Sequence, residues 1–198
     1  MNRAALFASA LLLLSQPVCA GKPAPPKAPA DAKKAEPAKV EIPKGEMARA
    51  EMKNAEGKKV GDVTIEQTPQ GVIVSVSLEN VPAGMHAFHI HETGKCEAPF
   101  KSAGGHFNPG THKHGIKSAE GKHAGDMPNV DVPEGGKIKF TFFNGDVTLK
   151  EGEKNSLLDA DGSAFVLHKG ADDYASDPTG GAGDRWACGV IEKDGAKK

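Results

Sequence analysis

The chain has 198 residues, of which 38% are hydrophobic and 26% are charged, and its formal net charge is −1. Seven of its 25 basic residues and three of its 26 acidic residues precede Glu46, so residues 46–198 carry a formal charge of −5. This acidic balance argues against a nucleic-acid-binding protein, which would need a basic face. Residues 46–198 are enough for one domain with a hydrophobic core.

The chain begins with a segment typical of export. Residues 1–20 combine the basic residue Arg3 with an apolar run that is too short to span a bilayer. Val18 and Ala20 occupy the −3 and −1 positions of a cleavage site after Ala20, as in a secretory signal peptide. We therefore predict a signal peptide, no transmembrane segment, and a periplasmic or secreted protein. Lipid attachment at Cys19 is the alternative.

Residues 21–45 cannot contribute to a core. They hold six Pro, six Lys and six Ala, but only one Val and one Ile. Such a composition predicts an extended, basic and disordered spacer. The spacer either is a solvated tether or binds an anionic surface of the cell envelope.

The remaining residues, 46–198, show mainly β-strand patterns. Residues 71–78 alternate, with Val74, Val76 and Leu78 on one face, and residues 137–142 alternate in the same way. Weaker strand candidates are residues 47–53, 59–67, 85–91, 146–149, 163–168 and 187–191. Gly and Pro separate almost all of these segments, and no segment keeps a helical period. We predict an all-β domain of about eight antiparallel strands, a sandwich or a flattened barrel.

Two segments are too long to be hairpin turns. Residues 92–133 are rich in Gly, His, Lys and Asp, and residues 169–186 are rich in Gly and Asp. Long loops on a rigid β scaffold usually carry function.

All eight histidines lie between positions 86 and 168. On a strand, His89 and His91 project from the same face, so both can bind one metal ion. His86 points to the opposite face and needs another role. Phe88 and Ile90 then face the core and fix the direction of the two ligands.

A second group lies on the first long loop and comprises His106, His112, His114, His123 and Asp126. A nitrogen-rich site with one carboxylate suits tetrahedral Zn²⁺. His168 stands alone in the sequence and would have to join the first group through the fold. So many ligands predict two ions, copper in an open imidazole-rich site and zinc in a closed His/Asp site. An imidazole shared by both ions could release one metal and take up a proton.

The cysteines agree with export. Once Cys19 leaves with the signal peptide, Cys96 and Cys188 remain. In an oxidising compartment two cysteines most simply form one disulfide.

Five motifs resemble the signatures of the copper–zinc superoxide dismutase family. They are GMHAFHIH (residues 84–91), AGGHFNPGTHKHG (103–115), KHAGDMPNV (122–130), HKGADDY (168–174) and GAGDRWACGVI (181–191). The resemblance runs in order through essentially all of residues 46–192, and the bacterial secreted branch is the most similar. It implies an eight-stranded antiparallel Greek-key β-barrel with two long functional loops.

The resemblance also implies a site. Copper would be bound by His89, His91, His106 and His168. Zinc would be bound by His106, His114, His123 and Asp126, with His106 as the bridge between the two ions. Asp172 would hydrogen-bond one copper ligand and one zinc ligand, and His86 would be a structural histidine beside the copper. A Cys96–Cys188 disulfide would tie the long loop to the barrel.

The implied activity is the disproportionation of superoxide to dioxygen and hydrogen peroxide, which protects the cell envelope, with one copper and one zinc per subunit. His106 would leave copper on reduction, carry a proton and return it. Arg185 would hold the superoxide anion beside copper, since a guanidinium stays charged at any working pH. Thr179 would lie at the rim of the channel.

Two features depart from the family pattern. Residues 170–184 hold no lysine but contain Asp172, Asp173, Asp177 and Asp184. An anionic substrate therefore needs a positive patch elsewhere, for which the candidates are Lys95, Lys101 and Lys113. His112 lies outside the family's ligand set and is interpreted as an exposed loop histidine.

Three alternatives are weighed against the enzyme. A non-catalytic copper or zinc carrier, and an envelope metal buffer or adhesion protein, would lack part of the copper set, the bridging histidine or Arg185, and none of these is missing. A copper-only relative would lack the zinc ligands, but His114, His123 and Asp126 are present. The sequence leaves both a homodimer and a monomer open.

Overall fold

The computed structural model describes residues 45–195. The predicted signal peptide and nearly all of the predicted spacer lie outside these residues. Within the described part of the chain there are ten β-strands and one short 3-10 helix, η1 (Lys101–Ala103). No helix in this part is long and apolar enough to cross a membrane.

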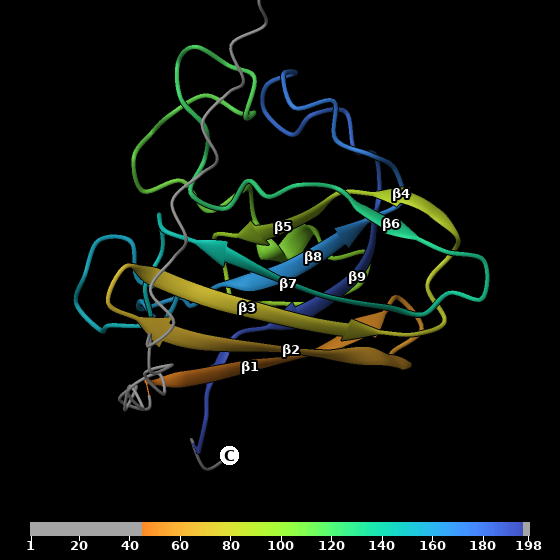
Figure 1. The fold of residues 1–198 in the computed structure, drawn as a ribbon, viewed down its shortest axis with the longest axis horizontal. Helices are drawn as coiled ribbons and strands as arrows, with labels where there is room; N and C mark the ends of the chain where they lie inside the picture. Colours follow the sequence, from red (N-terminus) through yellow and green to blue (C-terminus); the bar gives the residue numbers. More distant parts are fainter. Residues whose placement is uncertain (1–44, 196–198) are drawn as a thin grey trace, which may run out of the picture. The chain divides into compact units, whose positions relative to one another are not determined.

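Eight strands pair in one antiparallel sheet that curls on itself (Figure 1). Seven of them follow one another in the order β5 (Phe88–His91), β8 (Ala164–His168), β9 (Arg185–Val190), β1 (Met47–Asn54), β2 (Lys59–Thr68), β3 (Gly71–Leu78) and β7 (Ile138–Asn144). The eighth, β10 (Glu192–Lys193), also pairs with β1. A separate two-stranded sheet joins β4 (Gly84–His86) to β6 (Val130–Val132). The crossovers β3–β7 and β5–β8 confirm the predicted antiparallel Greek-key barrel.

The predicted alternation in residues 71–78 is confirmed. Val74, Val76 and Leu78 are buried, whereas Ser77 on the opposite face is exposed. The core lies inside the curl of the sheet and includes a stacked pair of rings, Phe88 and Phe165, with centroids 5.2 Å apart. Such a pair contributes about 0.5–1.5 kcal/mol beyond the burial of its area. Because Phe88 lies on β5, this packing anchors the strand that carries the first histidines.

Residues 85–91 form two strands where the sequence predicted one. The break is at Ala87, whose N–H donates to Gly170 O (2.8 Å) and whose carbonyl accepts from His168 N (2.9 Å). The chain therefore changes its partner from β6 to β8 at this residue. With β4 and β5 counted as halves of one broken strand and β10 as the continuation of β9, eight strands remain, but β6 takes the place of the strand predicted at residues 146–149.

The prediction of a strand at residues 146–149 is wrong. Val147 and Leu149 are buried, which gives the segment its strand-like pattern, but the only pairing described there is an isolated bridge between Thr148 and Ser156. The side-chain oxygen of Gln67 accepts from Leu149 N (2.6 Å) and from Thr148 Oγ1 (2.8 Å). A side chain therefore takes the place of a neighbouring strand. Conversely, β6 and β10 were not predicted.

The two long loops leave the barrel at the same end, above β5 and β8 in Figure 1. The predicted disulfide is confirmed and joins Cys96 on the first loop to Cys188 on β9. Around it Phe100, Ala103 and Val166 form a small apolar cluster that is separate from the main core. The start of the first loop is thus fixed to the barrel wall.

Candidate metal centre

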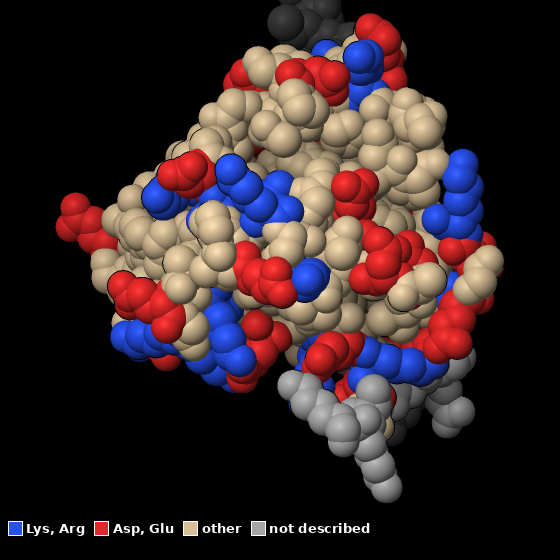
Figure 2. Space-filling view, turned by 180° about the vertical axis from the view of Figure 1, so that it is seen from behind, with Lys and Arg blue, Asp and Glu red and all other residues tan. Residues whose placement is uncertain are grey.

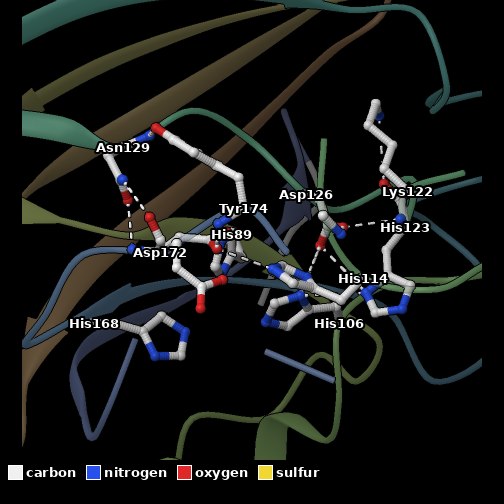
Figure 3. A network of polar contacts seen from close by, with 12 residues as sticks. His89, His106, His114, Lys122, His123, Asp126, Asn129, His168, Asp172 and Tyr174 are labelled. Atoms are coloured by element: carbon white, nitrogen blue, oxygen red, sulfur yellow. Dashed lines mark hydrogen bonds and ion pairs between the residues drawn. The ribbon is translucent and has the colours of Figure 1, made fainter. Parts of the chain in front are cut away.

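The structure brings the predicted ligands together in two groups. The copper group, as we name it, comprises His89, His91, His106 and His168, and the zinc group comprises His106, His114, His123 and Asp126. Within each group the ligand atoms lie within 4.8 Å of one another, and all seven side chains are buried. His106 belongs to both groups and lies between them in Figure 3.

The strands of the sheet position most of the copper group. His89 and His91 lie on β5, where Phe88 and Ile90 point into the core, and β5 pairs with β8, which ends at His168. His106 comes from the first loop and forms an isolated bridge with His91. Three of the four side chains thus stand on paired strands.

Backbone carbonyls fix two rings of the copper group. His91 Nδ1 lies 3.0 Å from Gly104 O, and His168 Nδ1 lies 3.2 Å from Gly183 O. A carbonyl can only accept, so the proton of each ring is on Nδ1 and the lone pair is on Nε2. The two Nε2 atoms face each other at 3.3 Å.

The other two rings contribute nitrogens that have no partner. His89 Nε2 lies 2.9 Å from the carboxylate of Asp172, which leaves His89 Nδ1 buried. His89 Nδ1 and His106 Nε2 are buried ring nitrogens without a hydrogen-bond partner among the described residues. Burying an unpaired polar atom is costly, so such atoms indicate a missing ligand. The copper group therefore has the donor set of an imidazole-bound metal ion.

The zinc group is built around one carboxylate oxygen. Asp126 Oδ1 lies 2.7 Å from His106 Nδ1, 3.0 Å from His114 Nδ1 and 3.2 Å from His123 Nδ1. Asp126 Oδ2 is held by the backbone N–H groups of Gly115 and His123, each at 2.9 Å. Three imidazole nitrogens and one carboxylate oxygen converge, which is a donor set that suits Zn²⁺.

Asp172 joins the two groups. Its Oδ2 accepts from His89 Nε2 at 2.9 Å, and its Oδ1 accepts from His114 Nε2 at 3.0 Å. These bonds fix which ring nitrogen of each histidine turns inward. Burial opposes the ionisation of Asp172, but the bonds from His89 and His114 outweigh it and lower the pKa to about 2.

Three rings of the copper group, His91, His106 and His168, are neutral at neutral pH. Burial lowers the pKa of His106 to about 4 and that of His168 to about 3, and it holds the pKa of His91 well below its ordinary value. Burial also opposes the ionisation of Asp126, but hydrogen bonds from His106 and His123 and from the backbone hold its pKa far below its usual range. At neutral pH the lone pairs are therefore available to a metal ion.

Arg185 lies beside the copper group. It is half-buried on β9, and its guanidinium donates to the carbonyl oxygens of Phe100 and Gly104. Gly104 O also accepts from His91 Nδ1. After burial and a neighbouring histidine, the charge of Arg185 is a further cause that lowers the pKa of His91. The disulfide-tied loop thus orients the arginine next to a ring of the copper group.

Three other predicted residues lie outside both groups. Each ring nitrogen of buried His86 lies near a carbonyl oxygen, Nδ1 2.8 Å from His168 O and Nε2 2.9 Å from Pro82 O, so the ring faces backbone as a structural histidine does. His112 is exposed on the loop. Thr179 is half-buried and precedes Gly180, and its predicted place at a channel rim stays a prediction.

The structure separates the three candidate lysines. Lys95 forms an ion pair with Glu97 (3.0 Å), and Lys113 forms one with Asp177 (3.3 Å). Lys101 has no ion pair among the described residues and lines a surface groove together with Arg185, although the acidic residues Glu56 and Asp184 line the same groove. Elsewhere the charges are mixed, and acidic and basic side chains lie next to one another on the face in Figure 2.

Two residues of the site were not predicted. Asn129 hydrogen-bonds the backbone of Asp172, and the hydroxyl of Tyr174 accepts from Asn129 N. Both lie within the motifs, Asn129 three positions after Asp126 and Tyr174 two after Asp172. Their closeness in sequence to Asp126 and Asp172 was the signal that could have identified them.

Comparisons with known proteins agree with this geometry. A family model described as copper/zinc superoxide dismutase matches residues 59–191. Superoxide dismutase (Cu-Zn) 1 of Aquifex aeolicus is 51% identical over 138 residues, which cover 69% of this chain and 82% of that protein. The crystal structure of a SOD-like protein from Bacillus subtilis matches with a TM-score of 0.70 and 39% identity, over 73% of this chain and 97% of the other. The Cu/Zn superoxide dismutase of Brucella abortus matches with a TM-score of 0.60 and 32% identity, over 74% and 99%.

Proposed function

The chain belongs to the copper/zinc superoxide dismutase family, and from this premise we propose that the copper group binds copper and the zinc group binds zinc. The protein is an oxidoreductase that converts two superoxide anions and two protons to dioxygen and hydrogen peroxide. One observation carries the assignment of the residues. Four ring nitrogens, two of them buried without a partner, face one another beside a second group that shares His106.

Copper bound in the first group supplies one-electron redox chemistry, and zinc in the second is structural. His106 links the two through its ring, since Nδ1 faces Asp126 and Nε2 faces the copper group. When His106 Nε2 is not engaged it can take a proton, and it can donate this proton to the reduced substrate. The zinc-group contacts at Nδ1 keep the ring in place meanwhile.

Arg185 binds the substrate. Its guanidinium is held by two carbonyl oxygens, and one of them, Gly104 O, also accepts from His91 Nδ1. A small anion at the copper group would therefore meet the positive charge of Arg185. Of the three candidate lysines, Lys101 is the one we assign to attracting superoxide, because it lines a groove with Arg185 and has no acidic partner among the described residues.

The alternative, a non-catalytic carrier of copper or zinc, is disfavoured by the same observations. A carrier does not need an arginine fixed beside the copper group or a histidine shared between two ion sites. Both are present here.

Superoxide decay measured on the purified mature protein, with copper and zinc content determined on the same sample, tests the function. We expect activity that requires copper, and about one ion of each metal per chain. A copper-loaded sample without activity would contradict the enzyme and favour the carrier.

We also propose that the enzyme works outside the cytoplasm. The leader of residues 1–20 and the spacer of residues 21–45 support export of the domain 46–198, and a disulfide is typical of oxidising compartments. The mass of the mature protein tests this proposal. Cleavage after Ala20 supports it, a lipidated Cys19 would establish the anchored alternative, and an uncleaved chain in the cytoplasm would contradict both.

A further inference from the structure

Asp172 can orient the rings of His89 and His114 only if its own position is fixed. Its carboxylate orients one ring of the copper group and one ring of the zinc group, yet it stands on the second loop rather than on a strand. The chain turns sharply just beyond it, since Tyr174 has a positive φ of 67°. A loop carboxylate is an accurate support for two rings only if its own backbone is held in place.

The side chain of Asn129 holds that backbone. Asn129 Nδ2 donates to Asp172 O at 2.8 Å, and Asp172 N donates to Asn129 Oδ1 at 2.8 Å. One amide therefore satisfies both the acceptor and the donor of the Asp172 backbone, across 43 positions of sequence. Asn129 directly precedes β6, whose residues Val130 and Val132 pack in the main core, so the support comes from an anchored strand. Each such hydrogen bond contributes about 1 kcal/mol net.

Tyr174 closes the ring of contacts, which Figure 3 shows. Its hydroxyl accepts from Asn129 N at 2.8 Å, and its N–H donates to Asp172 Oδ1 at 2.6 Å. Its carbonyl accepts from Lys117 N at 3.0 Å, on the loop that carries the zinc group. At Gly115, whose φ is 104°, a Cβ would lie 2.1 Å from Tyr174 O, so the zinc loop packs directly on this residue.

We propose that Asn129 and Tyr174 form a clamp that positions the carboxylate of Asp172, and that this clamp sets the affinity of the zinc group and the orientation of His89. The inference rests on the proposed metal assignment and extends it. Asn129 touches no ligand atom of either group and acts through Asp172. Loss of a partner that orients a ligand typically lowers metal affinity 10- to 100-fold.

The test uses zinc affinity, measured by competition with a chromophoric chelator, and the visible spectrum of the copper-loaded protein. In Asn129→Ala we expect zinc affinity to fall about 10- to 100-fold, with a shifted copper absorption. Asp172→Ala should show the same changes, and the double variant should be no worse than Asp172→Ala alone. That non-additivity is what a residue acting through Asp172 produces.

The matched control is Asn108→Ala. Asn108 makes the same pair of bonds to the backbone of His112, at 2.9 and 3.0 Å, and His112 belongs to neither group. We expect nearly unchanged zinc affinity in this variant. If Asn129→Ala does not fold, Tyr174→Phe removes one hydroxyl and should give a smaller change in the same direction.

A lowered melting temperature of Asn129→Ala with zinc affinity within twofold of the natural protein would overturn the clamp and leave a purely structural residue. Full additivity with Asp172→Ala, or an equal loss in Asn108→Ala, would overturn it as well. Failure of the proposed metal assignment gives a different result, because the natural protein itself would then bind no copper or no zinc.

Discussion

The copper group and the zinc group share His106 but are built in different ways. Three residues of the copper group stand on β5 and β8, whose pairing and aromatic packing fix them. All residues of the zinc group lie on the first long loop, held by bonds around Asp126. The barrel strands therefore position most of the copper group, whereas hydrogen bonds of the loops position the zinc group. Metal removal and mutation should affect the two regions differently.

The largest expected effect separates the two groups by activity. In His168→Ala the copper group loses one of its four ring nitrogens. Superoxide turnover should therefore fall more than about 100-fold, because losing a residue that only orients a ligand already costs up to about 100-fold. Zinc content should be retained. In the matched variant His123→Ala zinc should be lost and copper retained. Equal loss of both metals in both variants would show that the groups are not separable.

The disulfide tests how the loop is tied to the barrel. It joins residues 92 positions apart, and such a crosslink constrains the unfolded chain by about 4–5 kcal/mol in the entropy model. Replacing Cys96 and Cys188 by Ser should lower the free energy of unfolding by up to this amount in urea denaturation. It should also lower kcat/KM, because Phe100 and Gly104 no longer hold Arg185. An unchanged kcat/KM would contradict that role of the loop.

Acid should destabilise the metal-free protein through its buried rings. The folded-state pKa of His106 is about 4 and that of His168 about 3, whereas both titrate near 6.5 in the unfolded chain. Between these values the unfolded chain binds more protons, so the free energy of unfolding falls as pH falls below 6.5. The slope is up to about 1.4 kcal/mol per pH unit per histidine. Urea denaturation at pH 7 and pH 5 measures it.

The control for this pH effect is a histidine outside the groups. His112 is exposed on the same loop as the zinc group, so His112→Ala should keep the full pH slope. Removing a buried ring in His168→Leu should reduce it. A slope that is the same in His168→Leu and in the natural protein would show that the copper group is not the source.

The smallest expected effect concerns the approach of substrate. Lys101→Gln should lower kcat/KM roughly two- to threefold at low ionic strength and flatten its salt dependence, as expected for one unpaired charge near the site. Lys95→Gln is the matched control, because Lys95 is paired with Glu97. If the two variants behave alike, the groove beside Arg185 has no special role in attracting the anion.

The sequence predicted the metal centre better than it predicted parts of the barrel, for a physical reason. Metal ligands are few residue types at restricted spacings, so His89, His91 and the loop histidines stand out in the sequence. The break at Ala87 depends on bonds to Gly170 and His168, which no local pattern reveals. A strand was wrongly predicted at residues 146–149 because Val147 and Leu149 are buried in alternation, as in a strand. The backbone of Leu149 is hydrogen-bonded by the side chain of Gln67 and not by a neighbouring strand.

Asn129 and Tyr174 show the same limit within the site. An amide and a phenol occur in many roles. Their role here depends on hydrogen bonds between residues that are 43 and 45 positions apart in the sequence. Only the folded chain places them against Asp172. Residue type identifies a ligand, whereas topology identifies what positions it.

Native mass spectrometry of metal stoichiometry tests the central claim, two ion sites that share His106, most directly. The natural protein should bind one copper and one zinc, His168→Ala should bind zinc alone, and His123→Ala should bind copper alone. A single ion in the natural protein, or loss of both ions in either variant, would contradict the account.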